Sequence, residues 1–224
     1  MRPEDLARMI DHALLKPMQT DADLKQGCLQ AAGWKVFSVC VRPCEVRLAV
    51  QELKGSSVQV GTVIGFPQGG HHPRIKLAEA AQALADGASE LDMVANLGKI
   101  RENSWSYLTD EVAPILEMTR RQKRILKVIL ETAMLSAEEK IGACETLGRL
   151  GVDFVKTSTG YGDGGATVDD VRLMRGASPA GVQVKASGGI RTFEQAMALV
   201  EAGATRLGTA STGSLLQAAE AALR

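Results

Sequence analysis

One pattern of apolar and polar positions recurs along the chain: an amphipathic stretch ends near a glycine, and a short apolar run follows within a few residues. Glycine at such a point is the expected left-handed cap of a helix, and a strand directly after it marks a helix-to-strand junction. The pattern therefore predicts helices that alternate with strands. Four junctions carry it: Gly33 before 36–41, Gly87 before 90–94, Gly151 before 153–156 and Gly203 before 205–208.

Further apolar runs between these junctions bring the number of predicted strands to eight. They are rich in valine, isoleucine and leucine, as strands covered on both faces require, and their alternation with helices favours parallel pairing. Two predicted helices, 76–85 and 192–200, carry apolar residues at helical spacing that would pack them onto the sheet. The additional strands span 58–64, 125–130 and 182–185, with a short one at 9–13.

Eight strand–helix units predict an α/β protein built as a (β/α)8 TIM barrel. With 224 residues, 45% of them hydrophobic, and no linker-like stretch, we expect one domain over residues 1–224 with a short helix at its N-terminus. An open doubly wound sheet has the same alternation, and length alone does not separate the two. The lack of a Gly-x-Gly-x-x-Gly segment after the first strand argues against the dinucleotide-binding form of that sheet.

Charge and hydropathy exclude several kinds of partner. Twenty-six basic and 26 acidic residues leave no net charge, so no global field favours nucleic acid or an anionic membrane. No run of 18 apolar residues occurs, and the charged N-terminal segment lacks the apolar core of a signal peptide, which predicts a cytoplasmic protein. The cysteines at positions 28, 40, 44 and 144 have no metal-ligand spacing, so we expect reduced, mostly buried thiols and no metal.

Two lysines, Lys156 and Lys185, interrupt strands that otherwise have the composition of buried ones. An unpaired ammonium is so costly to bury that the group tends to lose its proton, and two converging amines would depress one pKa and create a nucleophile. The alternative is a structural layer in which the charges only neutralise one another. The polar residues expected at the mouth, where the strands end, are Asp11, Cys40, Asp92, Lys127, Glu131, Lys156 and Lys185.

Three glycine-rich turns follow the late strands, at 158–165, 187–191 and 208–213. Glycines let backbone N–H groups approach an anion, and the last loops of a barrel are a frequent phosphate site. The alternative interpretation is that of ordinary strand-to-helix turns. Elsewhere we expect His71 and His72 in an exposed loop, His12 near the mouth with a local hydrogen bond, and 120–124 at a solvated helix end.

Eight short motifs, spread over nearly the whole chain, together resemble those of one known family. They are DHALLKP at 11–17, VCV at 39–41, VIGFP at 63–67, ELDMV at 90–94, LKVILET at 126–132, FVKTSTG at 154–160, VKASGGIR at 184–191 and RLGT at 206–209. Their order is similar to that in deoxyribose-phosphate aldolase, a class I aldolase family with a (β/α)8 fold. The resemblance implies that Lys156 forms a Schiff base, that Lys185 lowers the pKa of Lys156, and that Asp92 helps to move protons through a bound water. It implies no metal or organic cofactor.

The same resemblance implies a substrate pocket for a small sugar phosphate. Cys40 and Lys127 would line it, and the phosphate would be bound at Gly160, Gly188, Gly189, Arg191, Gly208 and Ser211. A homodimer is the assembly expected from the family. Three features depart from the family pattern: Ala13 stands where threonine is common, Ala210 stands where another hydroxyl is expected, and residues 218–224 lack the C-terminal tyrosine of longer members.

The implied activity is that of a carbon–carbon lyase in deoxyribonucleoside catabolism, the reversible cleavage of 2-deoxy-D-ribose 5-phosphate to acetaldehyde and D-glyceraldehyde 3-phosphate. Two alternatives stay open: another imine-forming aldolase or a sugar-phosphate isomerase on the same barrel, and a non-catalytic barrel that binds a sugar phosphate. An isomerase would form no covalent adduct with a lysine, so borohydride trapping separates it from an aldolase. Thermal stabilisation by the sugar phosphate without turnover would indicate the non-catalytic protein.

Overall fold

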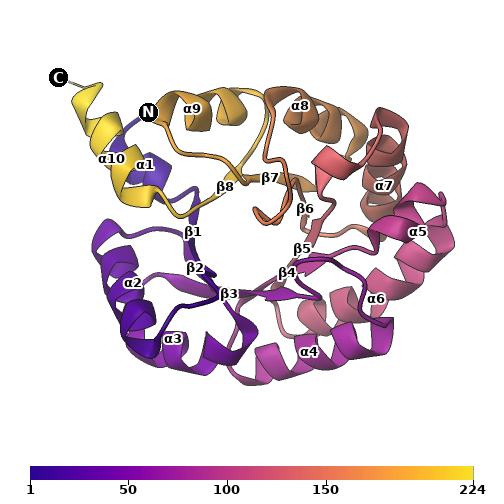
Figure 1. Cartoon of the computed structure of the whole chain (residues 1–224), viewed down its shortest axis with the longest axis horizontal. Helices are drawn as coiled ribbons and strands as arrows, with labels where there is room; N and C mark the ends of the chain where they lie inside the picture. The colour runs from indigo at the N-terminus through magenta and orange to yellow at the C-terminus, as the bar shows by residue number, and fades with distance from the viewer. Residues whose placement is uncertain (224) are drawn as a thin grey trace.

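Eight parallel strands close into a barrel in chain order, with β1 paired to β8, in the computed structural model, which describes residues 1–223 (Figure 1). The predicted barrel is therefore confirmed, and the open sheet is excluded. Each predicted strand lies within two residues of an observed one. The strands are β1 (Ile10–Leu14), β2 (Ser38–Val41), β3 (Gln59–Ile64), β4 (Glu90–Val94), β5 (Ile125–Ile129), β6 (Phe154–Lys156), β7 (Gln183–Ser187) and β8 (Arg206–Thr209).

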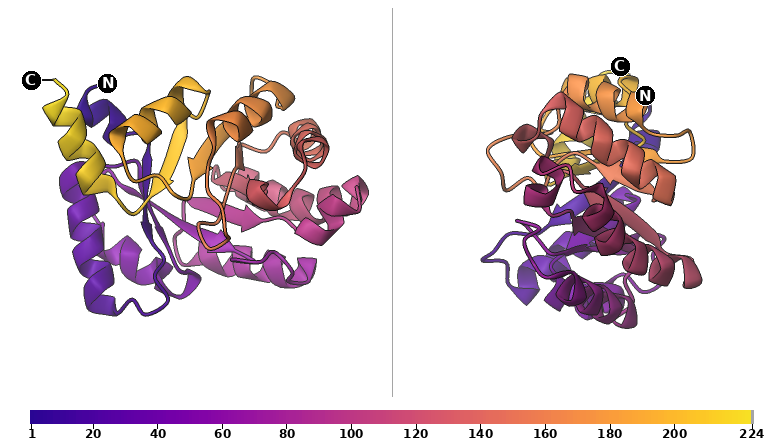
Figure 2. Two further views of the ribbon diagram at one scale, coloured as in Figure 1. Left: turned by 45° about the horizontal axis from the view of Figure 1, so that its top comes forward. Right: turned by 90° about the vertical axis from the view of Figure 1, so that its right-hand side faces the viewer.

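Helices surround the barrel, as the further views in Figure 2 also show. The predicted helix at 76–85 begins earlier, at Pro73, because the His72 side chain caps it by accepting a hydrogen bond from the N–H of Arg74. Thr192 caps the other predicted helix through a capping box with Gln195. The helices are α1 (Pro3–Ala7), α2 (Asp21–Trp34), α3 (Val46–Glu52), α4 (Pro73–Ala85), α5 (Leu97–Arg101), α6 (Trp105–Arg121), α7 (Ala137–Leu150), α8 (Val168–Ala177), α9 (Phe193–Glu201) and α10 (Thr212–Ala221), with 3-10 turns η1 (Pro43–Glu45) and η2 (Thr132–Met134).

Three of the four glycines expected at helix ends adopt left-handed backbone, with φ of 104° at Gly87, 75° at Gly151 and 114° at Gly203. The expectation for Gly33 is wrong. Helix α2 continues through Trp34, whose ring packs against His12, and the left-handed residue that ends this helix is Lys35, with φ of 55°.

The alternation of side chains along each strand decides which of them enter the barrel. In β4, Leu91 and Met93 belong to the apolar layer between strands and helices, whereas Asp92 points inward and meets side chains from β5, β6 and β7. The same alternation in β1 and β8 brings Asp11 and Arg206 together inside the barrel. The apolar core is therefore a shell around the barrel, and much of the barrel interior is charged.

Three of the four cysteines have their thiols covered by the fold. Cys28, Cys40 and Cys144 are buried free cysteines and Cys44 is an exposed one, so the prediction of mostly buried thiols is confirmed.

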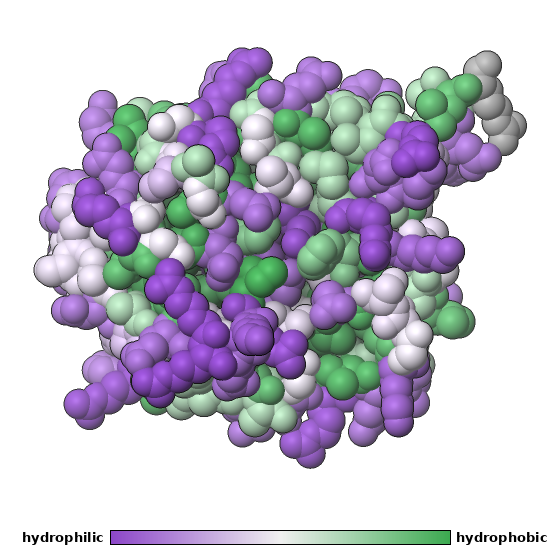
Figure 3. Space-filling model, turned by 180° about the vertical axis from the view of Figure 1, so that it is seen from behind, coloured by the Kyte–Doolittle hydropathy of each residue, from purple (hydrophilic) through white to green (hydrophobic). Residues whose placement is uncertain are grey.

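The face seen in Figure 3 is mainly hydrophilic, with apolar side chains scattered between polar ones. None of the helices within residues 1–223 is long and apolar enough to cross a membrane.

Candidate active site

Asp92, in the middle of β4, joins three lysines inside the barrel. Its Oδ1 accepts a hydrogen bond from Lys127 Nζ at 2.7 Å, and its Oδ2 accepts from Lys156 Nζ and from Lys185 Nζ, each at 2.7 Å. Lys156 ends β6 and lies directly opposite Lys185 in the register of β6 and β7. All four side chains are buried. The two lysines that the sequence singled out therefore converge on one carboxylate.

A second part of the same cluster lies around Asp11 and Arg206. Asp11 accepts hydrogen bonds from Lys185 Nζ at 2.5 Å and from the Arg206 guanidinium at 2.7 Å. Glu90 accepts from Lys127 Nζ at 2.7 Å and from the Arg206 guanidinium at 3.1 Å. The Arg206 guanidinium also lies 3.5 Å from the centroid of the Phe37 ring, a favourable cation–π position. The charges of the barrel interior thus form one connected network.

Lys156 differs from Lys185 in how the neighbouring charges shift its pKa. Burial lowers the pKa of Lys156 and the neighbouring Lys185 ammonium lowers it further, while Asp92 opposes both effects. Burial acts in the same direction on Lys185, but the Asp11 and Asp92 carboxylates outweigh it and raise the pKa of Lys185. Lys156 is therefore the amine that loses its proton most readily. Without it, the carboxylates of Asp11, Glu90 and Asp92 are matched one for one by the cations of Lys127, Lys185 and Arg206.

A cavity of about 290 Å³ opens beside Lys156, where the strands end. Cys40 and Lys185 also line it, and burial raises the pKa of the Cys40 thiol to about 11, so this thiol stays protonated at neutral pH. Lys127 is not among the described residues that line the cavity. Its ammonium is held by Glu90 and Asp92 within the network, so the expectation that Lys127 lines the pocket is wrong.

Glycines form the wall of the cavity on the side of β7 and β8. A Cβ on Gly208 would lie 2.8 Å from Ser187 Cβ and 3.1 Å from Lys185 Cε, so only glycine leaves room beside that amine. Gly188 has φ of 85°, a backbone conformation that favours glycine. The residues that the family resemblance assigns to phosphate all line this cavity: Gly160, Gly188, Gly189, Arg191, Gly208 and Ser211.

Donors for an anion remain available at this wall. Within residues 1–223, the N–H groups of Gly160, Gly188 and Gly189 donate to no protein acceptor. The Arg191 side chain is exposed at the cavity rim. Free backbone donors next to a guanidinium are suited to a phosphate group.

His12 lies on the outer side of β1, not at the mouth. Its Nδ1 is 2.9 Å from the hydroxyl of Thr212 on α10, and its ring packs edge-on against Trp34. Burial lowers the pKa of His12 to about 4, so the ring is neutral at pH 7. Because neighbouring residues of a strand face opposite sides, the inward position of Asp11 sends His12 outward. The expected hydrogen bond exists, but its partner Thr212 is 200 residues away, so the expectation that it is local is wrong.

The expected exposure of two further segments is confirmed. His71 and His72 are exposed before α4, and residues 120–124 are exposed apart from contacts of Arg120 with the carbonyls of Leu150 and Gly151. Ala13 and Ala210, two of the three departures from the family pattern, line the cavity beside Lys156 and also a second cavity of about 450 Å³ next to α2.

Sequence reasoning missed Glu90 and Arg206, which balance the charges of the network. A signal existed for Glu90, because it stands two residues before Asp92 in the same strand and must face the same side. Nothing near Arg206 indicates its partners, which lie in β1 and β4. Tyr161 was also missed, although it lines the cavity. Glu131, expected at the mouth, is buried behind the loop that follows β6 and binds Thr159.

Comparison with known proteins agrees with this arrangement along nearly the whole chain. The model of the DeoC/LacD family aldolases matches residues 6–216. The deoxyribose-phosphate aldolase of Thermococcus gammatolerans is 46% identical over 217 residues, which cover 96% of this chain and 96% of that protein. The deoxyribose-phosphate aldolase of Enterococcus faecalis is 46% identical over 209 residues, which cover 93% of this chain and 94% of that protein.

Solved structures give the same result. A tetrameric deoxyribose phosphate aldolase from Aeropyrum pernix superposes with a TM-score of 0.92 at 32% identity, covering 98% of this chain and 93% of that one. Orotidine 5'-phosphate decarboxylase from Pyrococcus horikoshii, with a TM-score of 0.65 at 13% identity over 95% of this chain and 96% of that one, shares the fold alone. The match of the family model and the two relatives at 46% identity place this protein in the DeoC/LacD family of aldolases.

Proposed function

We propose that this protein is a class I aldolase that cleaves 2-deoxy-D-ribose 5-phosphate to acetaldehyde and D-glyceraldehyde 3-phosphate and also catalyses the reverse addition. The observation that carries the proposal is the position of Lys156. Its amine has a lowered pKa, is not needed to balance the carboxylates of the network, and lines a cavity. A free amine in contact with substrate is what imine formation requires.

The first chemical step is addition of the Lys156 amine to the C1 aldehyde of the open-chain sugar. The resulting carbinolamine takes up a proton on its hydroxyl and loses water, which leaves an iminium ion between Lys156 and C1. The carboxylate of Asp92, 2.7 Å from Lys156 Nζ, lies where it would stabilise this positive charge. Lys185 keeps its own proton and thereby keeps the Lys156 amine free before the substrate arrives.

Cleavage then uses the iminium ion as an electron acceptor. The C3 hydroxyl loses its proton, the bond between C2 and C3 breaks, and its electron pair moves toward the iminium nitrogen. D-glyceraldehyde 3-phosphate leaves, and an enamine of acetaldehyde stays on Lys156. Protonation of the enamine carbon followed by hydrolysis releases acetaldehyde and restores the amine. Asp92 is the carboxylate that we assign to these proton transfers, through a water molecule.

The phosphate end of the substrate is assigned to the glycine wall. The free N–H groups of Gly160, Gly188 and Gly189, with Arg191 at the rim, provide the donors, and Gly208 and Ser211 complete the pocket. Cys40 lines the pocket beside the reacting carbons as an uncharged thiol. The reaction draws on these side chains alone, without a cofactor.

Borohydride trapping tests residue, mechanism and substrate together. Reduction in the presence of 2-deoxy-D-ribose 5-phosphate should leave one covalent adduct, and peptide mass spectrometry should locate it on Lys156. A Lys156→Ala variant should give neither adduct nor turnover. Turnover by that variant, or a rate that depends on added metal, would contradict the proposal. Isomerisation of the sugar phosphate without an adduct would indicate the isomerase, and thermal stabilisation without turnover the non-catalytic barrel.

We further propose a homodimer in the cytoplasm. The family resemblance supports the dimer, and the metabolic activity that the resemblance implies supports the compartment. Because the relative from Aeropyrum pernix is described as tetrameric, light scattering after gel filtration is the measurement that decides. A dimer requires a mass twice the 23.8 kDa of one chain, and a mass four times that value would replace the dimer by a tetramer.

A further inference from the structure

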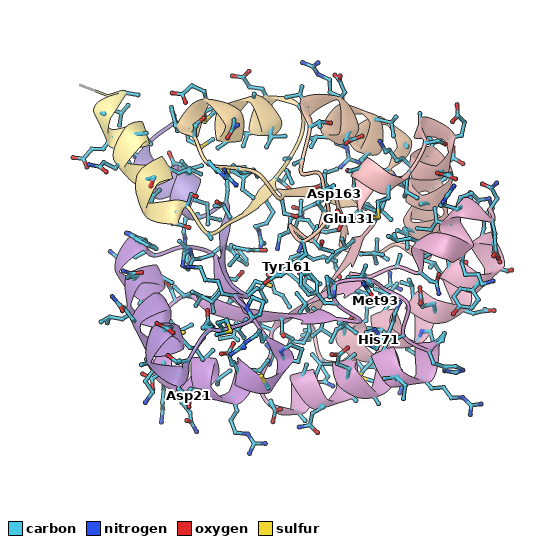
Figure 4. The ribbon with its side chains drawn as sticks, viewed as in Figure 1. Asp21, His71, Met93, Glu131, Tyr161 and Asp163 are labelled. Atoms are coloured by element: carbon cyan, nitrogen blue, oxygen red, sulfur yellow. The ribbon has the colours of Figure 1, made fainter. Side chains whose placement is uncertain are left out.

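The loop between β6 and α8 passes over the opening of the catalytic cavity. Figure 4 shows Tyr161 of this loop near the centre of the barrel, with Asp163 and Glu131 farther toward β5 and β6. Thr159, Gly160 and Tyr161 all line the cavity. The loop therefore supplies one wall of the site in which the sugar phosphate would bind.

Tyr161 connects this loop to two others across the mouth. Its hydroxyl donates a hydrogen bond of 2.5 Å to the carbonyl oxygen of Leu15, which follows β1. Its ring packs edge-on against Phe66, which follows β3, with the ring centroids 5.3 Å apart. One partly exposed side chain thus joins the loops after β6, β1 and β3.

The base of the loop has a separate anchor at Glu131. The Glu131 carboxylate accepts hydrogen bonds from both the N–H and the hydroxyl of Thr159, and the Thr159 hydroxyl in turn accepts one from the N–H of Tyr161. Glu131 adopts a left-handed backbone conformation, with φ of 49°, and among the described residues its buried Oε1 has no partner. Both features are unfavourable, and such features persist where a function requires them.

The loop beyond Thr159 consists largely of glycine. Gly160, Gly162, Gly164 and Gly165 lie within six residues, so the backbone itself resists bending very little. A Cβ on Gly165 would lie 2.4 Å from the carbonyl oxygen of Gly188, so in the observed position the loop touches the proposed phosphate wall. At its far end the loop is held to that wall by the N–H of Ala166, which donates to the carbonyls of Ser187 and Gly188. The contacts of Tyr161 hold the part of the loop that lies over the cavity.

We propose that Tyr161 is a positioning residue: its bond to Leu15 and its contact with Phe66 latch the loop over bound sugar phosphate and hold Gly160 against the phosphate. The inference rests on the proposed function, because the latch acts on the substrate's phosphate end. Release of the latch would let the loop move away and open the cavity. Lys156 and its charge network do not contact Tyr161, so imine chemistry with a substrate that lacks phosphate does not depend on the latch.

A single-oxygen change tests the latch by kinetics. Tyr161→Phe removes the bond to Leu15 and keeps the ring against Phe66, so the protein should fold as before. We expect KM for 2-deoxy-D-ribose 5-phosphate to rise about fivefold, as for loss of one hydrogen bond, while the rate of borohydride trapping with acetaldehyde stays unchanged. Tyr107→Phe, on α6, is the matched control. A KM equal to that of the control, or an equal loss in both assays, would overturn the latch.

The two tyrosines of this chain allow a second, direct measurement. In protein labelled with 3-fluorotyrosine, the Tyr107→Phe variant retains one ¹⁹F signal, that of Tyr161. Addition of inorganic phosphate should shift this signal if the loop closes on the anion, and a signal that does not respond to saturating phosphate would also overturn the latch. The ¹⁹F result does not depend on imine formation, so failure of the proposed function, shown by a lack of borohydride adduct, is distinguishable from failure of the latch.

Discussion

Two buried ion-pair sites in this protein have similar parts. In the first, Lys76 of α4 lies 2.6 Å from Glu111 of α6, with both side chains fully buried between helices. In the second, Lys156 lies 2.7 Å from Asp92 inside the barrel. Burial lowers the pKa of both lysines. By burial, distance and direction of the pKa shift alone, the two lysines would be judged alike.

They differ in charge balance and in access. Lys76 has one carboxylate to itself and a further acceptor in the carbonyl of Val94 at 2.8 Å, while the second oxygen of Glu111 accepts from the N–H of Asn96. This pair ties the end of β4 to α4 and α6, and neither member lines the cavity beside Lys156 or the second cavity next to α2. Lys156 shares its carboxylate with two other lysines and lines a cavity. A lowered lysine pKa thus indicates a nucleophile only where the cations outnumber the carboxylates and a substrate can reach the amine.

The largest expected effect is that of Lys156→Ala. Removal of the nucleophile should reduce turnover by more than about 10⁴-fold, and steady-state assays measure the loss. The free energy of unfolding, in contrast, should not fall. Because the pKa of Lys156 is lower in the fold than in the unfolded chain, the protonated amine destabilises the fold below its folded pKa, and this penalty disappears as pH rises toward 10.5. Urea unfolding at pH 7 should therefore show the variant to be at least as stable as the parent. A large loss of stability would mean that Lys156 is an ordinary structural ion-pair member.

Lys76→Met should give the opposite result. The change leaves the Glu111 carboxylate buried without its cation, which we expect to destabilise the fold by about 3–5 kcal/mol, measured by urea unfolding. The kcat of the folded fraction should stay that of the parent. The double variant Lys76→Met/Glu111→Leu should recover most of this loss, though not all, because Val94 and Asn96 lose their hydrogen-bond partners. A loss of kcat at full folding would remove the distinction between the two sites.

Lys185→Met tests the charge balance itself. Without the Lys185 ammonium, protonation of Lys156 becomes easier and its pKa rises, so imine formation should require higher pH. We expect the rate of borohydride trapping at pH 7 to fall by at least about tenfold, with its rise displaced to higher pH. Asp92→Asn, the matched control, removes the carboxylate that raises the pKa of Lys156, so the trapping rate should rise at lower pH than in the parent. Turnover should still fall, because proton transfer is impaired. Displacement in the same direction by both variants would contradict the proposed electrostatics.

The smallest effect should come from Lys25→Met, the same substitution at a solvent-exposed pair. Lys25 lies 3.4 Å from Glu52, with side chains 53% and 33% exposed. Water screens such a pair, so we expect a loss of less than about 1 kcal/mol in unfolding free energy and no change in kcat. If Lys25→Met and Lys76→Met destabilise the protein equally, burial is not the cause of the Lys76 effect.

The elements that were predicted well are those whose signal is local. The strand around Asp92 was predicted with both ends correct because five consecutive residues, Glu90 to Val94, carry its pattern and a glycine precedes it. Gly33 was misjudged because the end of α2 depends on a contact of Trp34 with His12 on another element. The same limit applies to His12, whose orientation follows from the side that Asp11 takes in the closed barrel.

The candidate residues were found to the extent that each was unusual in its own strand. Lys156 and Lys185 are lysines inside apolar runs, so their need for partners was visible in the sequence. Their partners were harder to identify, because Arg206 meets Glu90 across 116 residues and Lys185 meets Asp11 across 174. Tyr161 carried no signal at all, since its role depends on Leu15 and Phe66 from two other loops.

By itself the sequence determined the order of strands and helices, the barrel class and the presence of charged groups that had to be paired or used, because periodicity and the cost of burying charge act on short segments. Only the tertiary structure decided which lysine is not needed to balance the buried carboxylates. That outcome depends on how many carboxylates and cations the closure of the barrel brings within hydrogen-bonding distance, and on which amine is left at the wall of a cavity. Closure joins β1 to β8 and β4 to its neighbours, and local sequence carries no record of those distances.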